Sequence, residues 1–276
     1  HLQHLRQAGP ASTRRRPRRG PVIAVQLYTI RDLLQDPLHL GGVLGRLREI
    51  GYRAVEVAGL GPATIRGFGE ELRRADLIAC ACHVPLERLN ADLEGVVAQC
   101  REWGCEYVVV PSLPEAYRSE QGYRRFGAES VDLAQRMKSS GLRLVYHNHA
   151  HELERFGDQT GLDTLFGAAA GDALQAELDT YWLQFGGANP AAWIRRFKSR
   201  VPLVHLKDMA VLQGNPVDAE IGEGNLDWIE ILGACRDAET RWLVVEQDAP
   251  RRDPMESVAI SYANLAKLAA DLGWGG

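Results

Sequence analysis

From residue 21 onward, short apolar runs alternate with longer segments in which apolar residues recur every three to four positions. The short runs are typical of buried strands, and the longer spacing is typical of amphipathic helices. The pattern predicts eight strands, at residues 22–28, 54–58, 77–84, 106–111, 142–147, 174–179, 203–207 and 242–247. It predicts a helix after each strand, at residues 38–50, 63–75, 86–103, 122–140, 162–170, 190–199, 226–236 and 255–272.

This alternation predicts a parallel sheet, and no shift in composition marks a second domain. Eight strand–helix units close naturally into a (β/α)8 TIM barrel, which we expect as a single α/β domain over residues 21–276. The alternative is an open doubly wound sheet, which usually carries a glycine-rich phosphate turn after its first strand. Here the first strand runs into Thr29-Ile30-Arg31-Asp32, which contains no glycine.

Residues 1–20 differ in kind, because they hold five arginines between positions 14 and 19 and lack an apolar face. We expect a basic arm that packs on nothing, since it has too little apolar surface to offset the entropy lost on ordering. Deleting the arm should then leave melting temperature and activity unchanged. A polybasic contact with anions or nucleic acid is the alternative. The apolar run at residues 22–27 is too short for the core of a secretory signal.

The composition of the 276 residues, 45% hydrophobic and 25% charged, is that of an ordinary globular protein. A formal net charge of −4 makes nucleic acid an unexpected partner, because nucleic-acid-binding domains usually carry a basic face. No run of about 18 apolar residues predicts a membrane span. The five cysteines include no CxxC pair, which favours a reduced, cytoplasmic location.

The richest chemistry lies in the stretch LRLVYHNHAHE at residues 142–152. A predicted strand leads there into His147, His149, His151 and Glu152, so three of the eight histidines fall within five residues. Imidazoles and a carboxylate at one strand end suit a divalent metal or proton transfer better than they suit packing. The alternative is a polar loop that happens to be rich in histidine.

Active sites of TIM barrels lie where the strands end, so polar residues at the other strand ends are candidates too. These are Gln26, Tyr28, Glu56, His83, Asp179, His205, Lys207, Glu246 and Asp248. Each of these residues could instead have a purely structural role. For example, Glu56 could pair with an arginine, His83 could be a core histidine, and Lys207 could neutralise Asp208 or Glu246.

Asp179, His205 and Glu246 end three separate apolar strands. Buried charged groups must be paired or bound to a ligand, so three of them in one barrel mouth predict a shared cation. Carboxylate and imidazole donors without cysteine suit one divalent ion of Mn, Co, Zn, Fe or Mg. Such an ion could polarise a substrate carbonyl and stabilise an enediolate.

Seven short motifs carry a family resemblance that runs from about residue 22 to residue 272. They are VQLYTIRD, GYRAVEVAG, VYHNHAHE, ELDTYW, VHLKD, IGEGNLDW and VVEQD. The chain resembles the xylose-isomerase-like TIM-barrel superfamily of sugar phosphate isomerases and epimerases, and is similar to its branch of inosose dehydratases and keto-sugar epimerases.

The resemblance implies one divalent metal held by Glu152, Asp179, His205 and Glu246. Many relatives place a glutamate on strand five itself, where this chain has His147. Either Glu152 reaches back to the metal, or His147 or His149 replaces it. We expect Glu152 to bind the metal and a histidine to contact substrate or orient a ligand.

The implied reaction is isomerisation, epimerisation or dehydration of a small sugar, keto-sugar, polyol or inosose, in a possible homo-oligomer. The candidate catalytic residues are Glu152, Glu246, His149 and Lys207. The candidate substrate-binding residues are Gln26, Tyr28, Glu56, His83, His147, Trp182 and Glu223. The alternatives are a catalytically silent sugar-binding barrel and, less favoured, a DNA repair enzyme resembling endonuclease IV, which needs more histidine ligands and a basic groove.

Overall fold

The structure is a computed structural model that describes residues 20–274, so all but the last residue of the predicted basic arm lies outside the described residues. Eight parallel strands close into a barrel in the order β1-β12-β9-β8-β5-β4-β3-β2. They span Val22–Gln26 (β1), Ala54–Ala58 (β2), Ile78–His83 (β3), Tyr107–Val110 (β4), Arg143–His147 (β5), Leu174–Asp179 (β8), Leu203–Leu206 (β9) and Trp242–Val245 (β12). The predicted TIM barrel is therefore confirmed.

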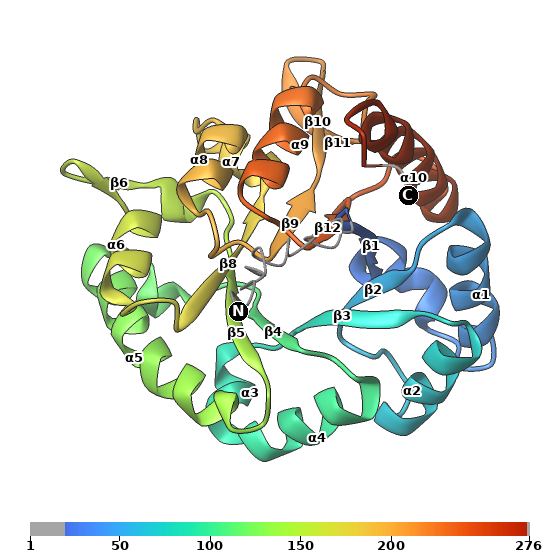
Figure 1. Cartoon of the computed structure of the whole chain (residues 1–276), viewed down its shortest axis with the longest axis horizontal. Coiled ribbons are helices and arrows are strands. Elements are labelled where there is room, and N and C mark those ends of the chain that lie inside the picture. The colour runs from blue at the N-terminus through green and yellow to red at the C-terminus, as the bar shows by residue number, and fades with distance from the viewer. Residues whose placement is uncertain (1–19, 275–276) are drawn as a thin grey trace, which may run out of the picture.

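Helices surround this barrel, as Figure 1 shows. They are α1 (Leu40–Ile50), α2 (Ile65–Arg74), α3 (Leu86–Ala91), α4 (Leu93–Trp103), α5 (Glu120–Lys138), α6 (Gly161–Ala168), α7 (Thr180–Phe185), α8 (Pro190–Arg196), α9 (Trp228–Asp237) and α10 (Pro254–Asp271). Three short 3-10 helices span Leu27–Leu34, Glu115–Tyr117 and His151–Leu153. Two small antiparallel hairpins, β6–β7 (Arg155–Phe156, Gln159–Thr160) and β10–β11 (Asp208–Leu212, Asn215–Ala219), lie outside the barrel sheet.

The predicted helix at residues 86–103 is two helices, because Asp92 leaves the helical region at φ −145° and ψ 58°. Its side chain then accepts a hydrogen bond from the Gly95 N–H and caps α4, a role that aspartate fills well. No described helix is both long and apolar enough to cross a membrane.

Two layers of buried apolar side chains stabilise the barrel. The outer layer lies between strands and helices, and a smaller inner layer fills the barrel itself. On six strands an inner-layer residue is followed two positions later by a polar residue: Ala24 and Gln26, Ala54 and Glu56, Ala81 and His83, Val145 and His147, Leu203 and His205, Val244 and Glu246. Side chains two apart on a strand share a face, so the barrel interior changes from apolar to polar at its C-terminal end.

Candidate metal centre and substrate cavity

A cavity of about 560 Å³ opens at the C-terminal mouth of the barrel. Its polar lining residues are Tyr28, His83, His147, His149, Glu246 and Asp248. Pockets for small ligands typically enclose about 300–1,000 Å³, so this one suits a small substrate.

Four buried side chains at this mouth converge as a metal site would require. His147, Asp179, His205 and Glu246 each offer one donor atom, and these atoms lie within 4.8 Å of one another. His205 Nδ1 is 2.8 Å from a Glu246 oxygen, and Asp179 Oδ2 is 3.7 Å from His205 Nδ1 and 3.8 Å from His147 Nε2. The side chains of Asp179, His205 and Glu246 lie close together in the structure, as predicted from the sequence.

Asp179 is held by its neighbours with one oxygen left over. Its Oδ1 accepts from the Trp182 N–H at 3.0 Å as the cap of α7, and its own N–H donates to Asn148 Oδ1 at 3.0 Å. Asp179 Oδ2 is buried and has no hydrogen-bond partner among the described residues. A buried carboxylate oxygen without a hydrogen bond is costly, so this atom, which has a 3.6 Å ion pair with Lys207 Nζ, is ready to bind a cation.

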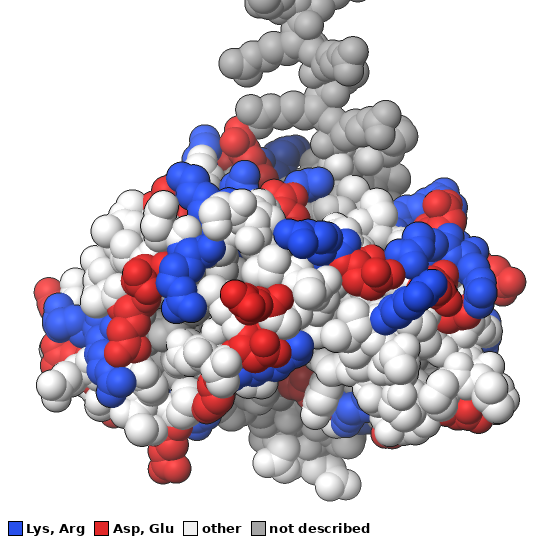
Figure 2. Space-filling model, turned by 90° about the horizontal axis from the view of Figure 1, so that it is seen from below, with Lys and Arg blue, Asp and Glu red and all other residues white. Residues whose placement is uncertain are grey.

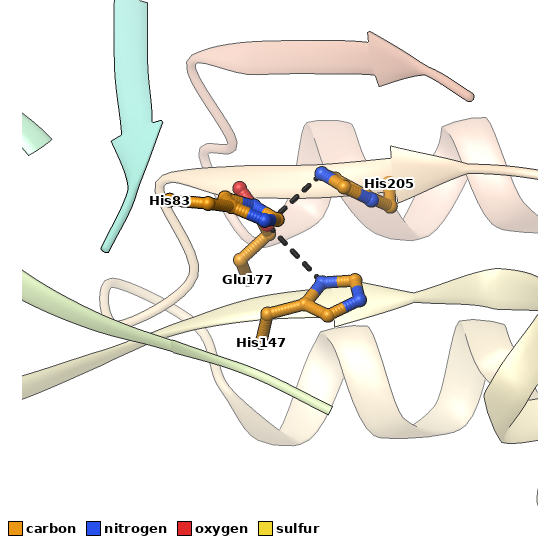
Figure 3. A group of neighbouring side chains, drawn as sticks. All are labelled: His83, His147, Glu177 and His205. Atoms are coloured by element: carbon orange, nitrogen blue, oxygen red, sulfur yellow. Dashed lines mark hydrogen bonds and ion pairs between the residues drawn. The ribbon is translucent and has the colours of Figure 1, made fainter. Parts of the chain in front are cut away.

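Glu177, two residues before Asp179 on β8, joins the histidines together (Figure 3). Its Oε1 lies 2.9 Å from His83 Nε2, 2.9 Å from His205 Nε2 and 3.1 Å from His147 Nδ1. Glu177 is not among the site residues predicted from the sequence. The signal was the Glu-x-Asp spacing in ELDTYW, which puts both carboxylates on one strand face.

Glu177 contacts one nitrogen of each of two imidazoles, so that the other nitrogen of each faces the proposed metal ligands. His147 and His205 turn one nitrogen towards Glu177 and the other towards Asp179. Histidine ligands of metals usually contact a carboxylate with their second nitrogen in this way. Glu56 adds a further carboxylate on the inner side, 2.5 Å from His205 Nε2 and 3.0 Å from His83 Nε2.

Charge in the site is set by burial and by these contacts. Burial opposes a charge on His83, yet Glu56 and Glu177 raise its pKa to about 10. Burial would raise the pKa of Glu246, but His205 and Lys207 lower it to about 2. Burial, together with the neighbouring His205, lowers the pKa of His147 well below its usual range. His147 is therefore neutral near pH 7, the form in which imidazole binds a metal.

A divalent cation fits these residues. The donors are carboxylate oxygens and imidazole nitrogens, which suit the predicted range of metals. Asp179 Oδ2 and Glu177 Oε2 are buried without a hydrogen-bond partner among the described residues.

Lys207 lies beside this group as a buried cation. Its Nζ is 2.5 Å from Asp248 Oδ2, 3.5 Å from Glu246 Oε2 and 3.6 Å from Asp179 Oδ2. Burial opposes its charge, but these three carboxylates raise the pKa of Lys207. Its Nζ also lies 5.2 Å from the centre of the Trp182 ring. Lys207 thus has Glu246 as a neighbour, as one structural reading predicted, and contacts Asp248, which lines the cavity.

Glu152 occupies a different place from the one expected of it. It is buried, and its carboxylate accepts from the Tyr146 hydroxyl at 2.6 Å and from the His149 N–H at 2.9 Å. It groups with His149 and His151, whereas His147 completes the set around Asp179. Burial raises the pKa of Glu152 to about 7. The carboxylate fixes the loop that carries His149.

The remaining predicted site residues divide between the cavity and its surroundings. Gln26 is buried and donates to Glu56 Oε1 at 2.7 Å, so Glu56 pairs with an amide and two histidines, not with an arginine. Tyr28 lines the cavity. Glu223 lies away from that lining, and its carboxylate is 2.6 Å from the Arg252 guanidinium.

Two curated relatives are similar in sequence to part or most of this chain. The rhizopine catabolism protein MocC of Rhizobium meliloti is 27% identical over 172 residues, which cover 55% of this chain and 51% of that protein. The chain therefore spans about half the length of this relative. An inosose dehydratase of Geobacillus kaustophilus is 24% identical over 268 residues, covering 82% of this chain and 84% of that one.

Solved structures share the fold. A sugar phosphate isomerase/epimerase from Parabacteroides distasonis aligns with a TM-score of 0.76 at 18% identity, covering 90% of this chain and 98% of that one. The IolI protein, solved with a zinc atom, aligns with a TM-score of 0.71 at 14% identity, covering 91% and 98%. The family model described as the xylose isomerase-like TIM barrel matches residues 44–268, and the chain belongs to that family.

Proposed function

We propose that this protein is a divalent-metal-dependent isomerase, epimerase or dehydratase that acts next to a carbonyl of a sugar, keto-sugar or inosose. The observation that carries the proposal is the buried group of His147, Asp179, His205 and Glu246 beside an open cavity. The inosose dehydratase and the zinc-containing IolI protein support it, because each shares most of this barrel.

His147, Asp179, His205 and Glu246 would hold the ion. When bound, a divalent cation supplies a Lewis acid that polarises a carbonyl and stabilises negative charge on its oxygen. Glu177 and Glu56 hold the inner sides of the imidazoles, which fixes the direction in which their outer nitrogens point.

Proton transfer falls to side chains that face the cavity. His149 is neutral near pH 7, because burial lowers its pKa to about 4, and its buried Nδ1 has no hydrogen-bond partner among the described residues. Burial raises the pKa of Asp248 to about 6, close to the range in which a general base is effective. We assign these two residues to proton transfer, and Lys207 to a substrate oxygen. Glu246, with its low pKa, serves as a ligand.

Deuterium exchange tests this proposal. The protein loaded with Mn²⁺ is incubated in D₂O with keto-inositols and keto-sugars, and mass and NMR spectra locate the deuterium. We expect exchange at a carbon next to the carbonyl, with a loss of more than a hundredfold in Asp179→Asn. Glu223→Gln is the matched control, since Glu223 lies outside the cavity lining, and should exchange at the rate of the unchanged protein.

Binding without exchange in every substrate tested would contradict the proposal and favour the silent sugar-binding barrel. The DNA repair alternative needs a basic groove, and on the face seen in Figure 2 acidic and basic side chains are interspersed.

A further inference from the structure

A second cluster of metal-binding side chains lies outside the candidate active site, between the barrel wall and the helix layer. It consists of Cys82 on β3, Cys100 on α4 and Cys105 in the turn between α4 and β4. The three Sγ atoms lie within 4.8 Å of one another, and the Cys82–Cys100 pair is 3.5 Å apart. The other two cysteines, Cys80 and Cys235, are not in this group.

Burial alone would not distinguish these thiols, since free cysteines commonly pack as small apolar side chains. Convergence does distinguish them, because the Cys105 and Cys82 side chains both interact with Cys100. These two contacts, helped by the charge of Arg88, outweigh burial and lower the pKa of the Cys100 thiol to about 4, while contact with Cys100, together with burial, raises the pKa values of Cys82 and Cys105. The thiolate is the form of cysteine that binds metals.

The three sulfur donors determine which kind of ion this site would bind. Three sulfurs without a carboxylate or imidazole in the group suit soft ions such as Cu(I) and zinc, and do not suit Mg, Ca or Mn. Structural zinc sites almost always have four ligands, and the described residues supply three here. Three coplanar sulfurs about 2.3 Å from an ion would be about 4.0 Å apart. The Cys82–Cys100 pair, at 3.5 Å, is closer than that separation, and none of the three pairs exceeds 4.8 Å.

We propose that Cys82, Cys100 and Cys105 form a second metal site, which takes one Cu(I) ion bound by three sulfurs. Binding releases to solvent the protons of those thiols that are still protonated, forms three copper–sulfur bonds and changes no oxidation state. The site would link β3 to α4 directly behind His83, the residue that follows Cys82 and lines the substrate cavity. It is independent of the divalent site and of the proposed reaction.

Anaerobic titration of the reduced full-length chain with Cu(I), against a chromophoric chelator, tests the site. We expect one equivalent to bind with ultraviolet sulfur-to-copper charge-transfer absorption. Cys100→Ser should weaken binding at least a hundredfold, whereas Cys235→Ser, a buried cysteine of α9 outside the cluster, should bind as tightly as the unchanged protein.

X-ray absorption of the copper-loaded, unsubstituted protein is the second measurement, and it decides the matter if Cys100→Ser does not fold. Three sulfur neighbours in one shell are expected. A shell of nitrogen and oxygen would place the copper at the histidines and overturn the proposal. Failure of the unsubstituted protein to bind Cu(I), or unchanged binding by folded Cys100→Ser, would overturn it as well.

Discussion

At the scale of single residues, Glu177 orients the histidines of the candidate metal centre. One of its oxygens touches His83, His147 and His205, which come from three different strands. Its position follows from strand alternation alone, but its importance does not, because no pattern in the sequence says which histidines will meet it. Glu177 therefore acts as a positioning residue for two proposed ligands.

We predict that Glu177→Gln weakens divalent metal binding by about ten- to a hundredfold, the usual effect of removing the carboxylate behind a histidine ligand. Glutamine keeps one acceptor oxygen, but it loses the negative charge that faces three imidazoles and replaces the second carboxylate oxygen with an NH2 donor. Competition with a fluorescent chelator measures the affinity, and Glu223→Gln is the control. Equal affinities in the two variants would show that Glu177 does not orient the ligands.

Glu152 gives a prediction about pH. Its pKa is about 7 in the folded chain against an ordinary 4.5, so the folded state holds more protons between these values. Its contribution to stability is then present in full below about pH 4.5 and is lost as pH rises through about 7.

Glu152→Gln removes this titration while keeping an acceptor for the Tyr146 hydroxyl. From about pH 5 to about pH 8, the unfolding free energy of the variant should rise relative to that of the unchanged protein by about 1–3 kcal/mol. Urea denaturation of both proteins at the two pH values measures the change. A constant difference between them would mean that Glu152 does not titrate in this range.

At the scale of elements, the sequence predicted the barrel strands well because each is a short, mostly apolar run. Residues 54–58 and 174–179 are strands to the residue. Two features that were missed depend on single side chains. Asp92 splits the helix at residues 86–103, and Asp179 begins the short helix α7 while also facing the metal group.

Helix packing offers a test with a matched pair of glycines. A Cβ on Gly127 of α5 would lie 2.2 Å from the Leu165 carbonyl oxygen on α6, whereas a Cβ on Gly167 of α6 would meet nothing within 4 Å. Gly127→Ala should lower the unfolding free energy by about 1–3 kcal/mol, because α5 and α6 must move apart.

Gly167→Ala should raise the unfolding free energy by up to about 1 kcal/mol, because alanine favours helix. Thermal or urea denaturation of the two variants provides the comparison. If Gly127→Ala proved as stable as Gly167→Ala, the close contact between α5 and α6 would be wrong.

At the scale of the whole molecule, eight regular strand–helix units determine the fold, and so the fold could be predicted from the sequence. The site could be read only in part. Asp179, His205 and Glu246 were predicted because strand ends meet at one barrel mouth, and they do converge. The expected fourth member was Glu152, whereas His147 lies with the other three side chains in the structure. The path of the loop between these two residues, which the sequence does not reveal, decides which side chain faces the mouth.

The direct test of the account is the metal content of the purified protein after exposure to Mn²⁺ and removal of the excess. We predict one divalent ion per chain in the unchanged protein and in Glu152→Gln, and a loss of that ion in folded Asp179→Asn, His147→Ala and Glu246→Gln. The account would be contradicted if Glu152→Gln lost the ion while His147→Ala retained it, because the ligand after strand five would then be the glutamate.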